Sequence, residues 1–427
     1  MQLVLDDRIG EFEFEFDLDD DVFHRNFDRR ARSGRGARSA RPGVGRLWMR
    51  WFIVMCLPVM VASATSAIGA WRAPGNLSVA ERSVEWLRGH HFGGLVSSAE
   101  STYYSHHQPP TGGTIKALPS TRSVGATTIS TGPTASVDGN IPAATAAPAP
   151  DAIAPFNATP IAGEGVWTRY GDTSNGATAL QVAYLRPDAV HGTVTAGVVR
   201  IDQTAARFQL VPGSSEPGHG PWSGGDHVGG DSMARLLAAF NSGFRVADSH
   251  GAFMMDGRAV GSLRDGAATL IIKSDGSMNV GAWGRDVGVA DNPQAIRQNL
   301  DLIVDGGKSV PGLDENTSTK WGKTVGNQMY VWRSGIGIDS AGRVIYVGSD
   351  GLSVKSLAGL LQRAGAVRAM ELDINHAWVS FNVFHHTADG QTTGTKLLAG
   401  MKKSANRYLT ADSRDFIAVI SREALTP

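Results

Sequence analysis

Short β-rich runs separated by turn signals recur from Glu164 to the C-terminus, and they constrain the fold more than any other feature. Branched and aromatic residues fill these runs, as they do in strands that pack on at least one face. Asp256-Gly257 and Asp275-Gly276 interrupt the pattern and favour hairpin turns, because Asp-Gly readily adopts positive φ. We expect strands at Val182–Leu185, Val194–Ile201, Phe208–Val211, Ala238–Phe240, Phe253–Met255, Thr269–Ile272, Leu300–Val304, Met329–Trp332, Val344–Val347, Val367–Leu372, Val379–Val383 and Phe416–Ile420.

Helices are fewer than strands in this region. The clearer one is expected over Ser353–Ala364, where leucines recur on one face and Gly365 follows as a stop signal. A shorter helix is expected around Ser232–Leu237. The mixture predicts an α+β domain over residues 164–427, with a large mixed, mainly antiparallel sheet system that carries a few helices.

The N-terminal part carries a membrane signal. Residues 6–21 hold nine acidic side chains and residues 25–50 hold nine arginines, and such blocks of charge are typical of disordered segments. Trp51–Ala70 then runs for twenty residues without a charge, about the length of a helix that crosses a bilayer core. We therefore expect a disordered cytoplasmic tail over residues 1–46 and a transmembrane signal anchor over residues 47–70.

The arginines before the apolar segment predict its orientation, because basic residues flanking a span stay in the cytoplasm. The domain after the anchor is then extracytoplasmic, on a single-pass protein of the cell membrane. A secreted protein is the alternative, since Ala62-Ser63-Ala64 resembles a signal-peptide cleavage site. Cys56, the one cysteine of the chain, lies in the apolar segment, so the exported part has no disulfide and depends on its core for stability.

Two segments are expected between the anchor and the β-rich domain. Residues 71–107 form a juxtamembrane segment with one short helix, because Ser78 and Glu81 fit a capping box. Residues 108–163 are dominated by Pro, Ala, Thr, Ser and Gly, a composition typical of a disordered linker. Such a linker lets the domain stand off the membrane.

Four of the expected strands end in a polar or charged residue that is followed by a turn. A side chain at a strand end is held by the sheet and still reaches solvent, and sites on β-containing folds are often built there. Asp and Asn also cap turns for purely structural reasons, which is the alternative for each stretch. The four are Phe240-Asn241-Ser242-Gly243, Val304-Asp305-Gly306-Gly307, Trp332-Arg333-Ser334-Gly335 and Leu372-Asp373-Ile374-Asn375.

The order of these motifs resembles the phosphodiester glycosidase family, whose known member class is N-acetylglucosamine-1-phosphodiester alpha-N-acetylglucosaminidase. That family shows Asn-Gly-Gly-Phe, an Arg-Thr-x-x-Gly stretch, a leucine helix ending in Gly-Ala, and Leu-Asp-Gly-Gly-Gly-Ser. The resemblance spans about residues 165–422 and is particularly close to a membrane-anchored actinobacterial form. The matching stretches here are Asn241-Ser242-Gly243-Phe244, Arg333-Ser334-Gly335-Ile336-Gly337, the helix from Ser353 to Gly365-Ala366, and Leu372-Asp373.

This chain departs from the family pattern in three places. Ser242 replaces the first glycine, Ser334 replaces threonine, and Ile374-Asn375-His376 stands where three glycines are expected. The last change adds side chains where the family loop presents bare backbone. We therefore count Asn375 and His376 among the candidate substrate-binding residues.

The resemblance implies cleavage of the bond between sugar C1 and oxygen in a sugar-1-phosphodiester. This reaction passes through an oxocarbenium-like state that a nearby carboxylate stabilises, attacks or supplies with activated water. Asp373 is the first candidate for that carboxylate. Glu371, two residues earlier on the same strand face, is the expected partner, with Asp305 as an alternative.

The phosphodiester leaves as a weakly basic anion, so a cation matters more than a strong general acid. Arg333 offers a planar fork that matches phosphate oxygens. Asn241 can position a hydroxyl group or bind developing charge through its amide. The alternative for Arg333 is a buried ion pair with Asp305 or Asp373.

We therefore expect an enzyme that hydrolyses or transfers at a sugar-1-phosphodiester in cell-envelope glycan or exopolysaccharide metabolism. The alternative is a non-catalytic glycan-binding or scaffold protein. Lys+Arg and Asp+Glu are equal at 40 each, which argues against a nucleic-acid partner, and we predict no cofactor. A metal site is the weaker alternative, since its candidate ligands lack a recognised spacing: Asp305, Asp373, His376, His385 and His386. The sequence leaves the oligomeric state open.

Overall fold

The structure is a computed structural model. It describes residues 61–72, 78–90, 108–119, 152–172, 178–218, 220, 222–314, 319–322 and 329–425, with isolated positions between 92 and 106. The predicted tail over residues 1–46 and residues 47–60 of the predicted anchor lie outside this part. Residues 61–72 are helical, and the described residues contain no helix long and apolar enough to cross a membrane.

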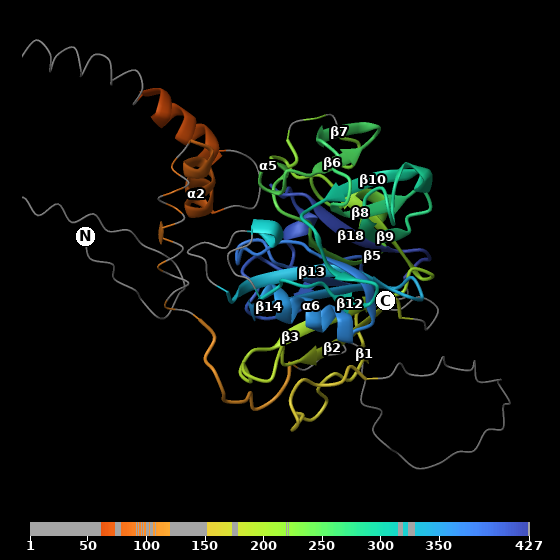
Figure 1. The fold of residues 1–427 in the computed structure, drawn as a ribbon. Helices are drawn as coiled ribbons and strands as arrows, with labels where there is room; N and C mark the ends of the chain where they lie inside the picture. The colour runs from red at the N-terminus through yellow and green to blue at the C-terminus, as the bar shows by residue number, and fades with distance from the viewer. Residues whose placement is uncertain are drawn as a thin grey trace, which may run out of the picture. The chain divides into compact units, whose positions relative to one another are not determined.

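Three sheets dominate the compact unit formed by residues 66–427 (Figure 1). The first sheet has the order β1 (Thr168–Arg169), β2 (Leu180–Leu185), β3 (Ala196–Ile201), β14 (Val344–Leu352), β13 (Val331–Asp339), β15 (Ala366–Glu371), β11 (Leu302–Asp305), β12 (Lys308–Ser309). The second has the order β7 (Arg258–Gly261), β6 (Ala252–Met255), β10 (Pro293–Gln298), β8 (Ala268–Lys273), β9 (Met278–Ala282). The third has the order β17 (Thr392–Lys396), β16 (Phe381–His386), β5 (Leu236–Asn241), β18 (Phe416–Ser421), β4 (Ala206–Val211).

The pairings between these strands are all antiparallel, so the predicted mainly antiparallel sheet system is confirmed, and the described residues add no parallel ladder to it. Each of the twelve predicted strands overlaps an observed one. The predicted turn at Asp256-Gly257 is also present, with both residues at positive φ between the paired Met255 and Arg258.

The main helix, α6 (Val354–Arg363), begins and ends as its sequence predicts. The Ser353 hydroxyl accepts a hydrogen bond from the Ser356 N–H at the N-cap, and Gly365 follows at φ +100°. The other helical elements of the described domain are short: α4 (Gly230–Met233), α5 (Val246–Ser249), η2 (Val289–Asp291), η3 (Thr319–Trp321) and η5 (Arg407–Leu409).

The prediction of a helix at Ser232–Leu237 is wrong beyond its first turn. α4 ends at Met233, and Leu236 and Leu237 belong to β5, where both are buried. Pairing with β16 and β18 places β5 in the middle of the third sheet. Burial between two strands therefore overrides the local helical preference of this short segment.

The first sheet separates two parts of the core. Along β14, Ile345 and Val347 face a cluster with Leu357 and Leu361 of α6, whereas Tyr346 faces the cluster that includes the other two sheets. The alternation follows from the period of two in a strand that is buried on both faces. It gives the first sheet a helix-covered face and a face that packs toward the third sheet.

Two segments before residue 164 also contact the domain. Ile153 is 3% exposed and packs in the cluster beneath α6, although the sequence assigns it to the linker. α2 (Val79–Gly89) carries the predicted capping box between Ser78 and Glu81.

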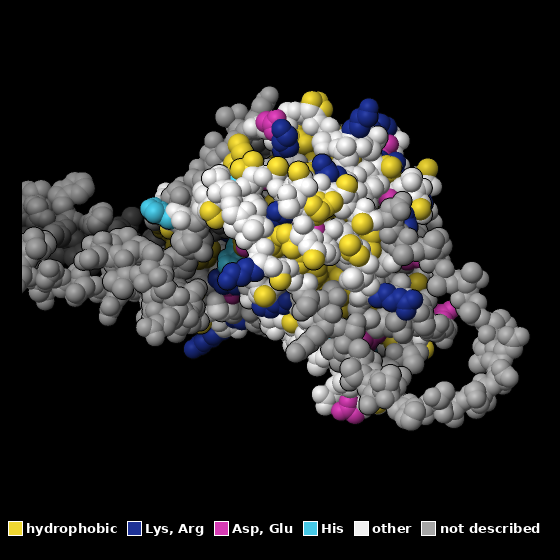
Figure 2. Space-filling model, turned by 90° about the horizontal axis from the view of Figure 1, so that it is seen from below, with side chains coloured by type: hydrophobic (Ala, Val, Ile, Leu, Met, Phe, Trp, Pro, Cys, Tyr) yellow, Lys and Arg dark blue, Asp and Glu magenta, His cyan; other side chains and the backbone are white. Residues whose placement is uncertain are grey.

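Charged side chains are dispersed on the face of the molecule drawn in Figure 2. Basic and acidic groups alternate there with hydrophobic ones, as expected for a chain with zero formal charge. This face therefore presents no single-sign field of the kind that attracts a polyanion.

Candidate active site

Three strand ends and the middle of a fourth strand meet where the first and third sheets approach each other. In antiparallel pairs, the end of one strand lies beside the start of its neighbour. Asn241, the last residue of β5, pairs with Phe416, the first residue of β18. Glu371, the last residue of β15, pairs with Gly335 in the middle of β13, so the prediction that a strand ends at Trp332-Arg333 is wrong, because β13 runs on from Val331 to Asp339. The polar residues adjoining these ends are thereby brought together.

Asn241 connects the two sheets. Its amide oxygen accepts hydrogen bonds from the Tyr346 hydroxyl at 3.1 Å and the Ser380 N–H at 3.0 Å. Its amide nitrogen donates to the Ser334 hydroxyl at 2.9 Å and to the Ser242 carbonyl at 2.9 Å. These bonds engage both ends of the buried amide, so Asn241 positions its neighbours.

A β-bulge at the end of β15 sets the direction of Asp373. The Ser334 carbonyl accepts from the Leu372 N–H at 2.8 Å, and the Ser334 N–H donates to the Asp373 carbonyl at 2.9 Å, so two residues face one. The Ser334 hydroxyl adds bonds of 3.2 Å to the N–H and the carbonyl of Asp373. A bulge interrupts the period of two and re-aims the following side chain. Asp373 is thereby tied to Asn241 through Ser334.

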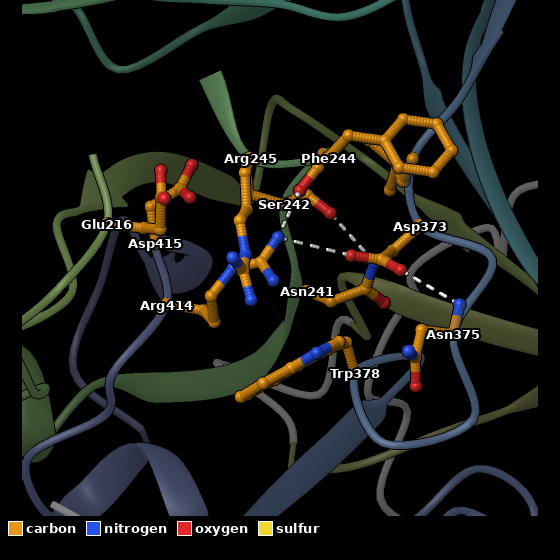
Figure 3. A network of polar contacts seen from close by, with 12 residues as sticks. Glu216, Asn241, Ser242, Phe244, Arg245, Asp373, Asn375, Trp378, Arg414 and Asp415 are labelled. Carbon is orange, nitrogen blue, oxygen red and sulfur yellow. Dashed lines mark hydrogen bonds and ion pairs between the residues drawn. The ribbon is translucent and has the colours of Figure 1, made fainter. Parts of the chain in front are cut away.

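The Asp373 carboxylate is buried and faces a guanidinium group (Figure 3). It is 3% exposed, accepts from the Asn375 N–H at 2.9 Å and lies 3.4 Å from an Arg414 Nη. Burial raises the pKa of Asp373, while Arg414, the loop N–H groups and Arg245 oppose this shift. The result is a carboxylate at a strand end with cations on one side of it.

Arg414 lies two residues before β18 and stacks on an aromatic ring. Its guanidinium carbon is 4.9 Å from the centroid of Trp378, and one Nη donates to the Gly243 carbonyl at 3.2 Å. Arg245 points toward the same centre in Figure 3 and forms an ion pair with Glu85 of α2. Two guanidinium groups therefore flank Asp373, and both have the planar geometry that suits phosphate oxygens.

Two further carboxyl groups lie on the far side of Arg414 in Figure 3. Asp415 accepts from Arg297 Nε at 2.8 Å, and both of these residues are buried. Glu216 is half-buried, and burial together with the neighbouring Asp415 raises its pKa against the opposing effect of Arg414.

Several buried polar atoms around this centre have no hydrogen-bond partner among the described residues. They are Ser242 Oγ, Ser413 Oγ, Arg414 Nε and Asp415 Oδ1. Buried polar atoms are normally paired, and exceptions gather where a ligand or ordered water supplies the missing bond. Their concentration beside Asp373 is consistent with a polar binding site.

The family model of phosphodiester glycosidases matches residues 234–373. This segment contains Asn241, Ser334 and Asp373, the three residues that the hydrogen bonds above join. Residues 234–373 are therefore similar to a phosphodiester glycosidase domain.

Three solved structures are similar to the chain. The catalytic domain of zebrafish N-acetylglucosamine-1-phosphodiester alpha-N-acetylglucosaminidase, auto-inhibited by its pro-peptide, shows 16% identity and a TM-score of 0.38, over 59% of this chain and 87% of that one. A hypothetical protein from Synechocystis shows 15% identity and a TM-score of 0.29, over 60% and 62%. An exported protein from Burkholderia pseudomallei shows 13% identity and a TM-score of 0.32, over 54% and 75%. No curated protein matches the chain.

Within the segment that matches the family model, Arg333 does not face the carboxylate of Asp373. Its Nη1 donates to Glu371 at 2.5 Å, its Nε donates to the Leu352 carbonyl at 2.8 Å, and Arg333 and Glu371 are each 1% exposed. The sequence analysis gave a buried ion pair as the alternative role of Arg333, with Asp305 or Asp373 as its partner. The structure corrects that partner to Glu371.

The same ion pair corrects the expected pairing of Glu371 with Asp373. The bulge after Leu372 breaks the alternation on which that expectation rests, so the two carboxylates contact different arginines. Burial raises the pKa of Glu371 to about 7, while Arg333 opposes the shift. Glu371 is 1% exposed, and Arg333 holds one of its carboxylate oxygens.

Asp305 lies at the opposite end of β15. Val304 pairs with Ala369 and the Gly307 N–H donates to the Val367 carbonyl, whereas Asp373 lies beyond the other end of β15. At about 3.3 Å per residue, this places the two carboxylates on the order of 15 Å apart. Asp305 pairs with Arg285 at 2.8 Å, so it is not a catalytic partner of Asp373.

The loop that replaces the family's glycines is ordered by its own side chains. The Asn375 amide oxygen accepts from the Ala377 N–H at 2.8 Å, and His376 stacks on Trp332 with ring centroids 5.4 Å apart. Burial and Lys402 lower the pKa of His376, which favours its neutral form. Asn375 therefore lies beside Asp373, and His376 packs against Trp332 in the same loop region.

The candidate metal ligands do not gather in one place. His385 and His386 both contact Asp172, at 3.1 and 2.9 Å, while Asp305 pairs with Arg285. The described residues contain no group of three or more His, Cys, Asp or Glu that could hold a metal ion.

Sequence reasoning missed Arg245, Arg414 and Glu216. Arg245 directly follows the Asn241-Phe244 motif, which is a signal that could have identified it. Arg414 and Glu216 lie outside the matched segment, and no local pattern links them to Asp373. Arg414 joins the site through the pairing of β18 with β5, and Glu216 joins it through backbone hydrogen bonds to Ser413.

Proposed function

We propose that this domain hydrolyses, or transfers a sugar from, a sugar-1-phosphodiester of a cell-envelope glycan or exopolysaccharide. The observation that carries the proposal is the placement of the Asp373 carboxylate against Arg414 and Arg245, within a domain similar to the phosphodiester glycosidase family. This reaction needs a carboxylate that acts on the sugar and cationic groups that bind the phosphate.

Asp373 acts on the sugar in this proposal. As the C1–O bond breaks, positive charge develops on the ring, and an ionised carboxylate close to C1 stabilises it. Asp373 is suited to this role because the bulge and the Ser334 hydrogen bonds hold it in one orientation. Its raised pKa sets the sign of the pH dependence, since activity falls as the pH drops and Asp373 takes up a proton.

Arg414 and Arg245 act on the phosphate. The leaving group is a phosphodiester anion, and guanidinium groups hold two of its oxygens and stabilise the charge that it gains. The unpaired Arg414 Nε and Ser242 Oγ would supply further hydrogen bonds. In the structure Arg245 forms an ion pair with Glu85, so the phosphate of a substrate must compete with this carboxylate for Arg245.

A non-catalytic glycan-binding protein is the second candidate. It is favoured by one observation, the substitution of Ile374-Asn375-His376 for the family's three glycines beside Asp373. Incubation with UDP-N-acetylglucosamine and with a synthetic sugar-1-phosphodiester separates the two functions. Release of free sugar that Asp373→Asn abolishes supports the enzyme, and retained binding without turnover across the substrate panel supports the binding protein.

We also propose that the domain is extracytoplasmic and tethered to the cell membrane through residues 47–70. The proposal rests on the uncharged run at Trp51–Ala70 and the arginines before it. Protease treatment of intact cells tests this topology: loss of an epitope at the C-terminus with survival of an N-terminal epitope is expected. Protection of both epitopes, or their release into the medium together, would contradict the anchor.

A further inference from the structure

We propose that Glu216 is the catalytic base of this site, the group that takes a proton from the water attacking the sugar C1. The inference rests on the proposed hydrolase function and assigns a residue outside the segment that matches the family. Nothing in the local sequence around Glu216 indicates this role. It follows from the position of Glu216 beside Arg414.

The backbone fixes Glu216 against the segment that carries Arg414. The N–H groups of Ser215 and Glu216 donate to the Ser413 carbonyl at 3.2 and 3.0 Å, and the Ser214 N–H donates to the Asp412 carbonyl at 2.8 Å. Glu216 therefore moves with Arg414 as one unit. A catalytic group needs such support, because small displacements reduce its effect.

The Glu216 carboxylate is little engaged by the protein. The one hydrogen bond to it from the described residues is long, 3.4 Å from the Val246 N–H, and the side chain is half-buried. Asp373, by contrast, is 3% exposed and bonded to the Asn375 N–H and Arg414. Water therefore reaches Glu216 more readily than Asp373.

Asp415 cannot take the same role, because Arg297 holds one of its oxygens at 2.8 Å and Asp415 is 2% exposed. It instead contributes a negative charge next to Glu216 (Figure 3). Burial and this charge raise the pKa of Glu216, which makes its ionised form a stronger base than an ordinary glutamate.

The step balances without a further reactant. The bond between C1 and the phosphate oxygen breaks first and its electron pair leaves with the phosphate, while Asp373 supports the oxocarbenium-like sugar. The water oxygen then forms a bond to C1 from the side that the phosphate leaves, which is the side of Arg414 and Glu216. Glu216 takes the proton that water loses and later releases it to solvent. The products are a free sugar and a phosphomonoester, and Arg414 holds the departing phosphate.

Glu216→Gln and Glu216→Ala in the full-length protein test the assignment, with Asp314→Asn as a surface control. Asp314 pairs with Lys355 of α6, on the helix-covered side of the first sheet. Turnover of a synthetic sugar-1-phosphodiester is expected to fall about 10²–10⁴-fold in both Glu216 variants, with KM little changed. In Glu216→Ala, sodium azide is expected to restore turnover and to yield a glycosyl azide, since azide attacks without a base.

The pH profile provides an independent measurement. Wild type needs both Glu216 and Asp373 ionised, and the pKa of each is raised, so its activity falls steeply as the pH is lowered. Glu216→Gln is expected to lose one of these two ionisations and show a shallower acid limb, whereas Glu216→Asp keeps both and loses less activity.

Turnover and an acid limb like those of wild type in Glu216→Gln would overturn the role of Glu216 and leave the proposed function standing. An inactive Glu216→Ala that azide does not rescue, with an unchanged melting temperature, would also overturn it. Absence of turnover in wild type across the substrates would instead overturn the proposed function and this assignment with it.

Discussion

Replacing Arg333 by methionine separates the two roles that this arginine can have. The sequence predicts that Arg333 binds the substrate phosphate, whereas the structure pairs it with Glu371 in the core. The substitution removes the Nη1 bond to Glu371 and the Nε bond to the Leu352 carbonyl. It leaves a buried carbonyl and a buried carboxyl group without this donor.

The expected cost depends on pH in a definite direction. The pKa of Glu371 is raised from 4.5 to about 7, so its contribution to the free energy of unfolding is complete below pH 4.5 and is lost as the pH rises through about 7. Without Arg333 the folded-state pKa rises further, because the cation that lowers it is gone. The loss then continues above pH 7.

At pH 6, where Glu371 is mostly protonated with or without Arg333, the cost of the unpaired Leu352 carbonyl is about 1–3 kcal/mol. At pH 9 the cost rises to about 3–5 kcal/mol, as expected when one partner of a buried ion pair is removed. Urea unfolding at both pH values, followed by tryptophan fluorescence, measures this difference. Arg285→Met, which removes an exposed ion pair with Asp305, is the control and is expected to cost at most about 1 kcal/mol.

KM for a sugar-1-phosphodiester is expected to change little in folded Arg333→Met. A variant as stable as wild type at both pH values, with KM raised about tenfold or more, would refute the reasoning. Arg333 would then bind the phosphate as the sequence predicts.

Three further substitutions test other parts of the structure. Arg414→Met removes a cation beside Asp373. The KM for a sugar-1-phosphodiester, measured in initial-rate assays, is expected to rise by at least about tenfold, because a hydrogen bond to a charged group contributes about 1.5–3 kcal/mol. An unchanged KM would exclude Arg414 from phosphate binding. Glu85→Gln weakens the ion pair that occupies Arg245, so kcat/KM in the same assay is expected to increase, and a decrease would show that this pair supports the site. Ser353→Ala removes the N-cap of α6 and is expected to lower the free energy of unfolding by about 1 kcal/mol with no effect on KM, and an altered KM would mean that α6 positions the site more directly than its packing indicates.

Much of the fold could be predicted because its strands are hydrophobic and its turns carry explicit signals. Two of the strands that escaped prediction, β10 and β17, carry polar residues. β10 carries Arg297 and Gln298, which are 1% and 0% exposed and form buried hydrogen bonds, and β17 is rich in threonine. Such strands lack a hydrophobic pattern because partners distant in sequence satisfy their side chains.

Part of the candidate site could also be predicted, because explicit sequence motifs mark it. The family motifs placed Asn241 and Asp373 correctly at neighbouring strand ends, and the Ser334 hydroxyl joins them. The direction of Asp373 relative to Glu371 was not predictable, because it depends on a bulge at Leu372-Asp373 that the sequence does not mark. Arg414 was missed because it reaches Asp373 through strand pairing across 41 residues of chain.

Turnover of a sugar-1-phosphodiester by wild type and by Asp373→Asn tests the central claim most directly. The asparagine keeps the size of the side chain and removes the charge that supports the oxocarbenium-like state. We predict release of free sugar by wild type, and a fall in kcat of at least about 10²-fold in Asp373→Asn with substrate binding retained. Turnover by a folded Asp373→Asn at the rate of wild type would contradict the claim.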